Sequence, residues 1–131
     1  LKYWEDLGYA FGPTVFMSSG CDSTWGAITF RLPTQEELQG AIRQHHLATT
    51  KRYSFTHSPT NIISADIYFQ DNAAASKPFI VEHEIGHALG WLHASPEGHI
   101  MNAAWKKSGA NPSGVSHENY KSQKLSISFG E

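Results

Sequence analysis

Stretches that alternate apolar and polar residues are followed along the chain by stretches with a helical repeat. Four segments are rich in β-branched and aromatic residues, are bounded by glycine, proline or serine, and are predicted to be strands: 14–19 (TVFMSS), 27–32 (AITFRL), 48–57 (ATTKRYSFTH) and 61–69 (NIISADIYF). The pair Ser58-Pro59 predicts a turn between the last two strands. Residues 2–11 (KYWEDLGYAF) predict the end of a helix that runs into a further strand.

The helical repeat is clearest in residues 34–46. Thr34 and Glu37 have the spacing of a capping box, and one face of this helix carries Leu38, Ala41, Ile42 and His45. A second helix is predicted in the apolar segment 79–92, because Lys77-Pro78 precedes it and proline is tolerated in a first helical turn. Beyond it, residues 106–114 predict a loop, and a short final helix is predicted from about Ser116.

This alternation of strands, helices and loops predicts a single α/β (α+β) layered domain over residues 1–131, rather than a helical bundle or a β-sandwich. A hydrophobic content of 40% with 17% charged residues is typical of a globular protein. The net charge of -2 provides no basic surface for nucleic acid, and no apolar run approaches the roughly 20 residues of a membrane helix. We therefore expect no nucleic-acid partner and no membrane insertion, and we expect a monomer.

Three of the eight histidines lie close together in the stretch VEHEIGHALGWLHASPEGHIM, residues 81–101. His83 and His87 are four residues apart, so on a helix both imidazoles lie on one face with Cβ atoms about 5–6 Å apart. Gly90 is suited to end that helix in the left-handed conformation, which would let His93 turn back as a third ligand. Three nitrogen ligands leave the fourth position of a zinc ion open, as in catalytic sites.

Glu84 follows the first of these histidines and lies about 100° further round the helix, so it is not expected to bind the ion. A carboxylate there can take a proton from a water on the metal and pass it to a leaving amine, which predicts amide hydrolysis. The alternative interpretation is that these histidines are simply scattered on an amphipathic helix, and H-E-x-x-H alone would be weaker evidence against it. The glycine and the third histidine at their offsets favour a metal site.

The stretch HEIGHALGWLH matches the H-E-x-x-H-x-x-G-x-x-H signature of the metzincin metallopeptidases, and Met101 stands where matrixins carry the methionine of their Met-turn. The chain therefore resembles a matrixin catalytic domain. The resemblance implies three zinc ligands (His83, His87, His93), a general base (Glu84), a turn (Gly90) and an apolar floor beneath one catalytic zinc (Met101). It also implies a polypeptide substrate and a secreted protein.

The fold that the resemblance implies is zincin-like. It has a twisted, mostly parallel sheet with an antiparallel edge strand, an active-site helix, a Met-turn and a C-terminal helix. The upper part would comprise residues 1–90, and the lower part residues 91–131 with the third ligand. Residues 64–72 (SADIYFQDN) resemble the strand before the active-site helix, and residues 47–50 (LATT) the edge strand along which substrates align.

Residues 3–11 (YWEDLGYAF) resemble the end of the first long helix, so we expect a chain truncated at its N-terminus, without the first strand. A rival alignment makes residues 27–32 the first strand and residues 34–46 the first helix, which the capping box supports. That alignment leaves too little chain between Phe55 and the active-site helix for the usual strands, so we prefer the first.

The chain departs from the matrixin pattern at two metal positions, because Tyr68 replaces a zinc-binding histidine and Gln70 an acidic calcium ligand. A second zinc is therefore not expected. Calcium bound by Asp66 and Asp71 is one alternative, and solvated loop carboxylates are the other. Asn102-Ala103 replaces the residues that usually shape the main specificity pocket, and a candidate pocket comprises Trp91, Ile100 and Trp105. Buried aromatic residues that only fill the core are the alternative interpretation.

Other reactive residues are given ordinary roles. Cys21 is the single cysteine, so no disulfide forms within the chain, and its neighbours do not match the matrixin sequence that blocks the zinc. A second metal site at His45, His46 and His57 is a less favoured interpretation than ordinary surface or core positions for these histidines. His99 and His117 are expected to have ordinary loop roles. The predicted function is a zinc-dependent endopeptidase. The alternatives are a catalytically silent, metal-stabilised peptide-binding module and a hydrolase of non-peptide amides.

Overall fold

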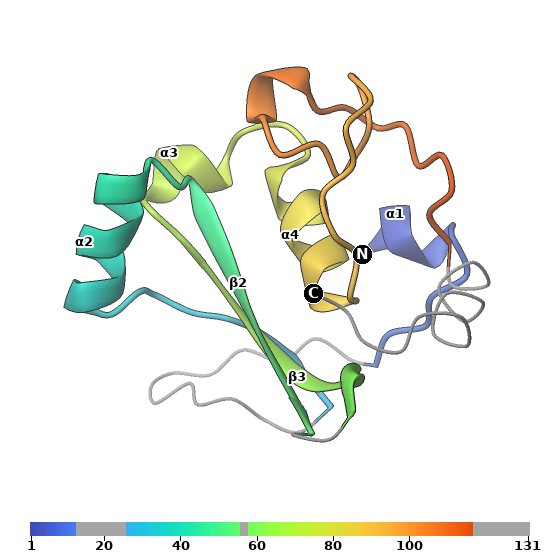
Figure 1. The fold of residues 1–131 in the computed structure, drawn as a ribbon, viewed down its shortest axis with the longest axis horizontal. Coiled ribbons are helices and arrows are strands. Elements are labelled where there is room, and N and C mark those ends of the chain that lie inside the picture. Colours follow the sequence, from blue (N-terminus) through green and yellow to red (C-terminus); the bar gives the residue numbers. More distant parts are fainter. Residues whose placement is uncertain (13–25, 56–57, 117–131) are drawn as a thin grey trace.

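The computed structural model describes residues 1–12, 26–55 and 58–116. It is a small α+β arrangement around a mixed three-stranded sheet (Figure 1). Its elements, in chain order, are α1 (Lys2–Glu5), β1 (Ile28–Phe30), α2 (Gln35–Gln44), β2 (Ala48–Phe55), β3 (Ser58–Phe69), α3 (Asn72–Ala75), α4 (Ile80–Ala88) and the 3-10 helix η1 (Trp105–Lys107). None of the described helices has the length and apolar character that crossing a bilayer requires. The strand predicted at 14–19 and the helix predicted beyond Ser116 lie outside the described residues.

β3 is the central strand of the sheet, with the order β1-β3-β2. β1 runs parallel to β3 and β2 runs antiparallel to it. β2 contains most of the segment predicted to be an antiparallel edge strand, and it occupies that position in the described sheet. With one parallel and one antiparallel pair, this sheet is mixed rather than mostly parallel.

Two boundaries differ from the prediction. Ser58 and Pro59 do not form a turn but begin β3, where Ser58 is paired with Phe55. The register between β2 and β3 shifts around Ser54, and proline, which has no N–H to donate, is tolerated at such irregular strand starts. Residues 9–12 form no strand. Tyr9 instead packs against the hydrophobic core and its ring lies edge-on to Trp4, 5.8 Å between centroids.

The two faces of the sheet carry different chemistry because successive side chains of a strand point to opposite sides. On β3, Ala65 and Ile67 belong to the hydrophobic core against α4, whereas Asp66 and Tyr68 face the side of α2. On β2, Thr50 bonds a residue of α4 while its neighbour Thr49 lines a cavity with α2. The helices α2 and α4 therefore lie on opposite faces (Figure 1).

Charges, more than apolar contacts, attach α2 to the sheet. The predicted capping box of Thr34 and Glu37 is present, but on the face predicted to be apolar only Ala41 is buried, and Ile42 is 53% exposed. Arg31 donates from Nη1 to Glu37 at 2.8 Å and from Nε to Asp66 at 3.0 Å. The bond from Arg31 holds the pKa of Glu37 well below its usual range. Lys51 of β2 also pairs with Glu37, so this carboxylate joins the helix to β2 directly and to Asp66 of β3 through Arg31.

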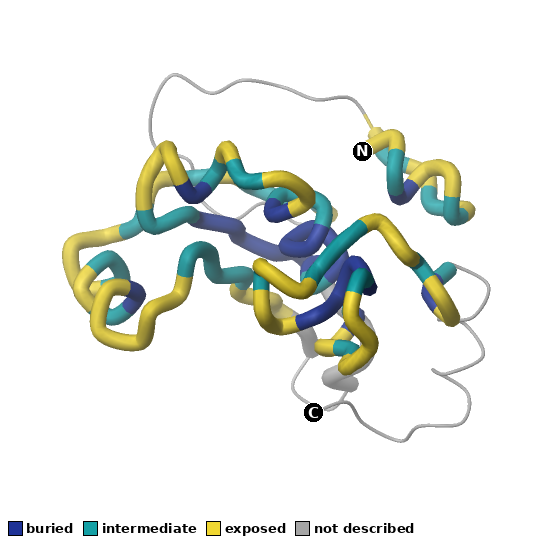
Figure 2. The backbone as a smooth tube through the Cα atoms, turned by 90° about the horizontal axis from the view of Figure 1, so that it is seen from above, coloured by how far each residue is buried: buried dark blue, intermediate teal, exposed yellow. Residues whose placement is uncertain are grey.

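The core on the other face is built around α4. Figure 2 shows the buried residues gathered in the centre of the molecule. Trp4 of α1 is fully buried, and its Nε1 donates to the backbone oxygen of Glu82 at 2.8 Å. Gly86 lies on the same side of α4, where a Cβ atom would be 2.5 Å from Met101 Sδ and 2.7 Å from Trp4 Cζ2. A glycine in mid-helix is thus required by close packing.

We predict that Gly86→Ala destabilises the protein by about 1–3 kcal/mol, because overpacking outweighs the gain in helix propensity. Urea denaturation of the metal-free protein measures this change in the free energy of unfolding. Gly40→Ala is the matched control, since the nearest atom to its Cβ is 3.9 Å away. It is expected to stabilise α2 by up to about 1 kcal/mol. A Gly86→Ala variant as stable as wild type would contradict the close packing of α4 on Met101 and Trp4.

Candidate metal centre

The helix α4 ends just before Gly90, as its sequence predicted. Its last residue is Ala88, the C-cap is Leu89, and Gly90 follows with φ 108°. The N–H of Gly90 donates to His87 O at 2.9 Å, and the N–H of Trp91 donates to Gly86 O at 3.0 Å. This pair of bonds is the Schellman arrangement, in which a residue without Cβ adopts the left-handed conformation. The chain reverses there and carries His93 back towards the helix.

The structure brings His83, His87 and His93 together. Each offers one ring nitrogen, and these nitrogens all lie within 4.8 Å of one another. The Nε2 atoms of His87 and His93 are 3.1 Å apart. Zinc–nitrogen bonds of 2.0–2.1 Å at tetrahedral angles would separate two ligand nitrogens by about 3.3 Å, so the separation between His87 and His93 is close to that of two ligands on one ion.

Hydrogen bonds to backbone oxygens orient the two histidines of α4. His83 Nδ1 lies 2.7 Å from Ile100 O, and His87 Nδ1 lies 2.8 Å from Trp91 O. A carbonyl oxygen can only accept, so each Nδ1 carries the proton and donates it. The Nε2 lone pair of each ring is left for a metal ion, as is usual when a second partner fixes the tautomer of a ligand.

The electrostatic environment keeps all three imidazoles neutral. Burial lowers the pKa of His83, and it lowers the pKa of His87 to about 3 with a further contribution from the neighbouring His83. Burial also lowers the pKa of His93, which is the most exposed of the three. Neutral imidazole is the form that binds metal, and three nitrogen donors suit zinc better than calcium or magnesium, which prefer oxygen.

Glu84 lies next to this cluster in the chain but is not a member of it, as predicted from its position on the helix. The residue is 5% exposed, and its Oε1 accepts a hydrogen bond from Thr50 Oγ1 at 2.6 Å. Burial raises the pKa of Glu84, while the bond from Thr50 and the nearby His46 act in the opposite direction. A buried carboxyl group with a raised pKa is suited to accept and return a proton near neutral pH.

The segment around Met101 packs against α4, and its neighbour Ile100 is bonded to His83 of the cluster. Met101 is fully buried against Gly86, its N–H donates to His99 Nδ1 at 3.0 Å, and its oxygen accepts from Ala94 N at 2.8 Å next to His93. His99 is buried and its Nε2 lies 2.9 Å from Ser113 O. The sequence interpretation gave His99 an ordinary loop role. No local signal distinguishes it, because its partners are set by the fold of the loop.

The three residues predicted to form a substrate pocket, Trp91, Ile100 and Trp105, lie in different surroundings. Trp91 and Ile100 belong to the hydrophobic core, where Trp91 Nε1 also donates to Tyr9 OH at 2.9 Å. Trp105 begins η1 instead, and its Nε1 donates to Pro78 O at 3.1 Å. The alternative of core-filling aromatics therefore holds for Trp91, since the reversal at Gly90 directs it inward.

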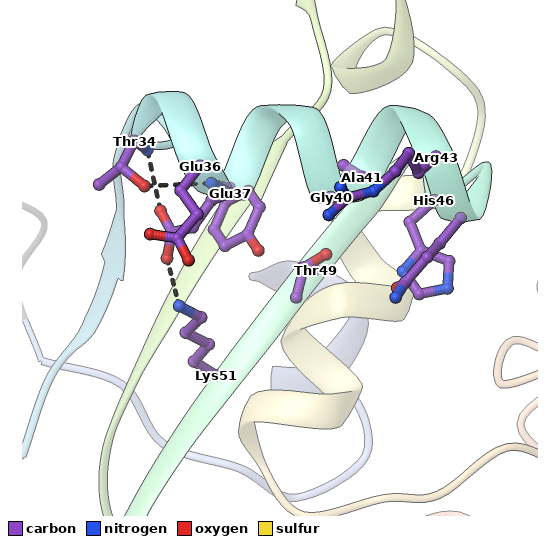
Figure 3. Close-up of a pocket in the computed structure, with 11 residues that line it drawn as sticks. Thr34, Glu36, Glu37, Gly40, Ala41, Arg43, His46, Thr49 and Lys51 are labelled. Atoms are coloured by element: carbon purple, nitrogen blue, oxygen red, sulfur yellow. Dashed lines mark hydrogen bonds and ion pairs between the residues drawn. The ribbon is translucent and has the colours of Figure 1, made fainter.

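A cavity of about 510 Å³ lies instead between α2 and β2 (Figure 3). Glu37 and Lys51 line it near the start of α2, and Arg43 and His46 line it near the end of that helix. His46 also lowers the pKa of both Glu84 and His93 through its charge, so this end of the cavity lies near the histidine cluster. No local pattern in the sequence predicted this position of His46.

The other proposed metal sites find no support among the described residues, where the three histidines of the cluster are the group with metal-binding spacing. Asp66 is paired with Arg31, and Asp71 Oδ1 accepts from Ala74 N at 2.7 Å as the cap of α3. Neither carboxylate therefore joins a calcium cluster there. His45 and His46 form no described metal group, and His57, His117 and Cys21 lie outside the described residues.

Comparison with known proteins found a viral relative whose name is that of a metalloproteinase. The chain is similar to a protein of Spodoptera frugiperda ascovirus 1a named "Putative matrix metalloproteinase", with 29% identity over 132 residues. The match covers 86% of this chain and 31% of the viral protein, so the chain spans about a third of the length of that relative. No family model matches the chain, and no solved structure matches it.

Proposed function

We propose that this protein is a zinc-dependent endopeptidase of the matrixin type. The observation that carries the proposal is the convergence of three neutral histidines beside a buried carboxylate with a raised pKa. His83, His87 and His93 would hold the ion. When bound, zinc would supply a Lewis acid that polarises the peptide carbonyl and acidifies a water molecule.

The residues of the chain have distinct parts in this proposal. Glu84 takes a proton from the attacking water and returns it to the amine that leaves, so no net proton is consumed by the carboxylate. The backbone bonds to Ile100 and Trp91 hold two of the imidazoles in the orientation that binding requires. The edge strand β2 can pair with an extended polypeptide and align it beside Glu84.

Several further features belong to the proposal by resemblance to matrixins. They are a single catalytic zinc, a monomeric protein that is secreted, and the division into an upper part (residues 1–90) and a lower part (residues 91–131). The polypeptide nature of the substrate rests on the same resemblance together with the free edge of β2 in the described sheet.

The purified protein is expected to bind one zinc ion per chain and to cleave an unfolded, reduced and alkylated protein substrate. Removing the ion with a chelator should stop cleavage, and adding zinc should restore it, whereas calcium alone should not. Metal analysis and electrophoresis of the products provide the measurement. A zinc-loaded protein that binds peptides but cuts none over long incubation would instead identify a peptide-binding module.

A further inference from the structure

Thr50 lies on β2 opposite the carboxylate of α4. Its Oγ1 is 2.6 Å from Glu84 Oε1 and 3.1 Å from the backbone oxygen of the same residue. Thr50 is paired across the sheet with Ile67, a fully buried core residue, so the backbone that carries the hydroxyl is fixed by the sheet. The contact joins the edge strand directly to the residue proposed as the general base.

The hydrogen-bond pattern of Glu84 is one-sided. Among the described residues, the hydrogen bond from a side chain to this carboxylate comes from Thr50 and is accepted by Oε1. A hydroxyl has one proton to donate, and an ionised carboxylate accepts it more strongly than a backbone carbonyl does. Oε1 is thereby occupied, so we assign proton exchange with water to Oε2.

Threonine is suited to this position. A β-branched side chain has few accessible χ1 rotamers, so its hydroxyl is held in place with little loss of entropy. The period of two along β2 turns Thr50 towards α4 and Thr49 towards the cavity beside α2. A hydroxyl at position 49 could not reach Glu84, which makes the contact specific to one of the two adjacent threonines.

We propose that Thr50 is a positioning residue, which holds the Glu84 carboxylate in the orientation needed for proton transfer. The inference rests on the proposed function and assigns the edge strand a second task beside substrate alignment. Thr50 touches neither substrate nor the histidine cluster in this assignment. It acts through Glu84, so its loss should lower the rate of the chemical step while leaving zinc affinity and substrate binding unchanged.

The test compares Thr50→Val, which keeps the shape and removes the hydroxyl, with Thr50→Ser, which restores it. For Thr50→Val we expect kcat to fall about ten- to a hundredfold at unchanged KM and unchanged zinc content. Thr50→Ser should recover most of kcat. Thr29→Val on β1 is the matched control, because it makes the same change in the same sheet away from Glu84, and it should keep the wild-type kcat.

A measurement without turnover tests the contact itself. A hydrogen-bonded Thr50 hydroxyl proton should exchange slowly and give a resonance in proton NMR of the metal-free protein. This resonance should vanish in Thr50→Val and shift in Glu84→Gln.

An active wild type together with an equally active Thr50→Val variant, or a Thr50→Ser variant as impaired as Thr50→Val, would overturn the positioning role alone. A wild type that binds zinc and shows the hydroxyl resonance but cleaves nothing would overturn the proposed function, and the positioning role with it.

Discussion

Replacing Glu84 with glutamine is expected to lower the rate of peptide cleavage about 10²–10⁴-fold while the protein keeps its zinc. Glutamine has the same shape but cannot accept a proton from water at neutral pH. The three imidazoles are untouched, and Glu84 is not among the residues whose atoms form the cluster. Single-turnover kinetics and metal analysis of the same preparation separate loss of chemistry from loss of the ion.

The fold should tolerate this substitution. The Glu84 side chain is buried, and its raised pKa shows that the environment disfavours the charged form, so a neutral amide there removes a desolvation cost. The amide oxygen can still accept from Thr50. We therefore expect the free energy of unfolding to be equal to that of wild type or higher.

Glu82→Gln is the matched control for Glu84→Gln, because it makes the same change on the same helix, at a residue outside the histidine cluster. It should leave cleavage unchanged. Wild-type activity in Glu84→Gln would remove this carboxylate from the mechanism. Equal loss in both variants would show that the effect comes from altering α4 rather than from the proton acceptor.

Replacing His87 with alanine should weaken zinc binding by more than about a hundredfold and abolish cleavage. The loss of a residue that only orients a ligand already costs 10–100-fold, and His87 is a proposed ligand itself. In the wild type its Nε2 lies 3.1 Å from that of His93, so two nitrogens would remain where three converged. Competition with a chromophoric chelator measures the affinity.

Stability provides a second measurement of the same substitution. Zinc that binds the folded protein should raise the melting temperature of wild type by an amount that grows with the logarithm of the zinc concentration divided by Kd, and this increase should disappear in His87→Ala. His45→Asn is the control, since His45 is exposed, lies outside the cluster, and has a left-handed backbone that asparagine tolerates. If His87→Ala bound zinc as tightly as wild type, the three-histidine site would be wrong.

Features that depend on a few neighbouring residues could be predicted from the sequence. The capping box of Thr34 and Glu37 is one, and the end of α4 just before Gly90 is another, because both are set by bonds within about one helical turn. The same holds for His83 and His87, whose spacing of four places them on one face. His93 follows only three residues after the chain reversal at Gly90, so its return to the helix could also be predicted.

Features that depend on contacts between distant segments were decided by the tertiary structure. Thr50 and Glu84 are 34 residues apart, and Arg31 and Asp66 are 35 apart, so no periodicity connects them. Trp91, predicted to line a pocket, is buried and bonded to Tyr9, which lies 82 residues away in the chain. Local bonding determined which residues could serve as ligands and base, whereas long-range packing determined what surrounds them, because burial and partner choice are properties of the assembled layers.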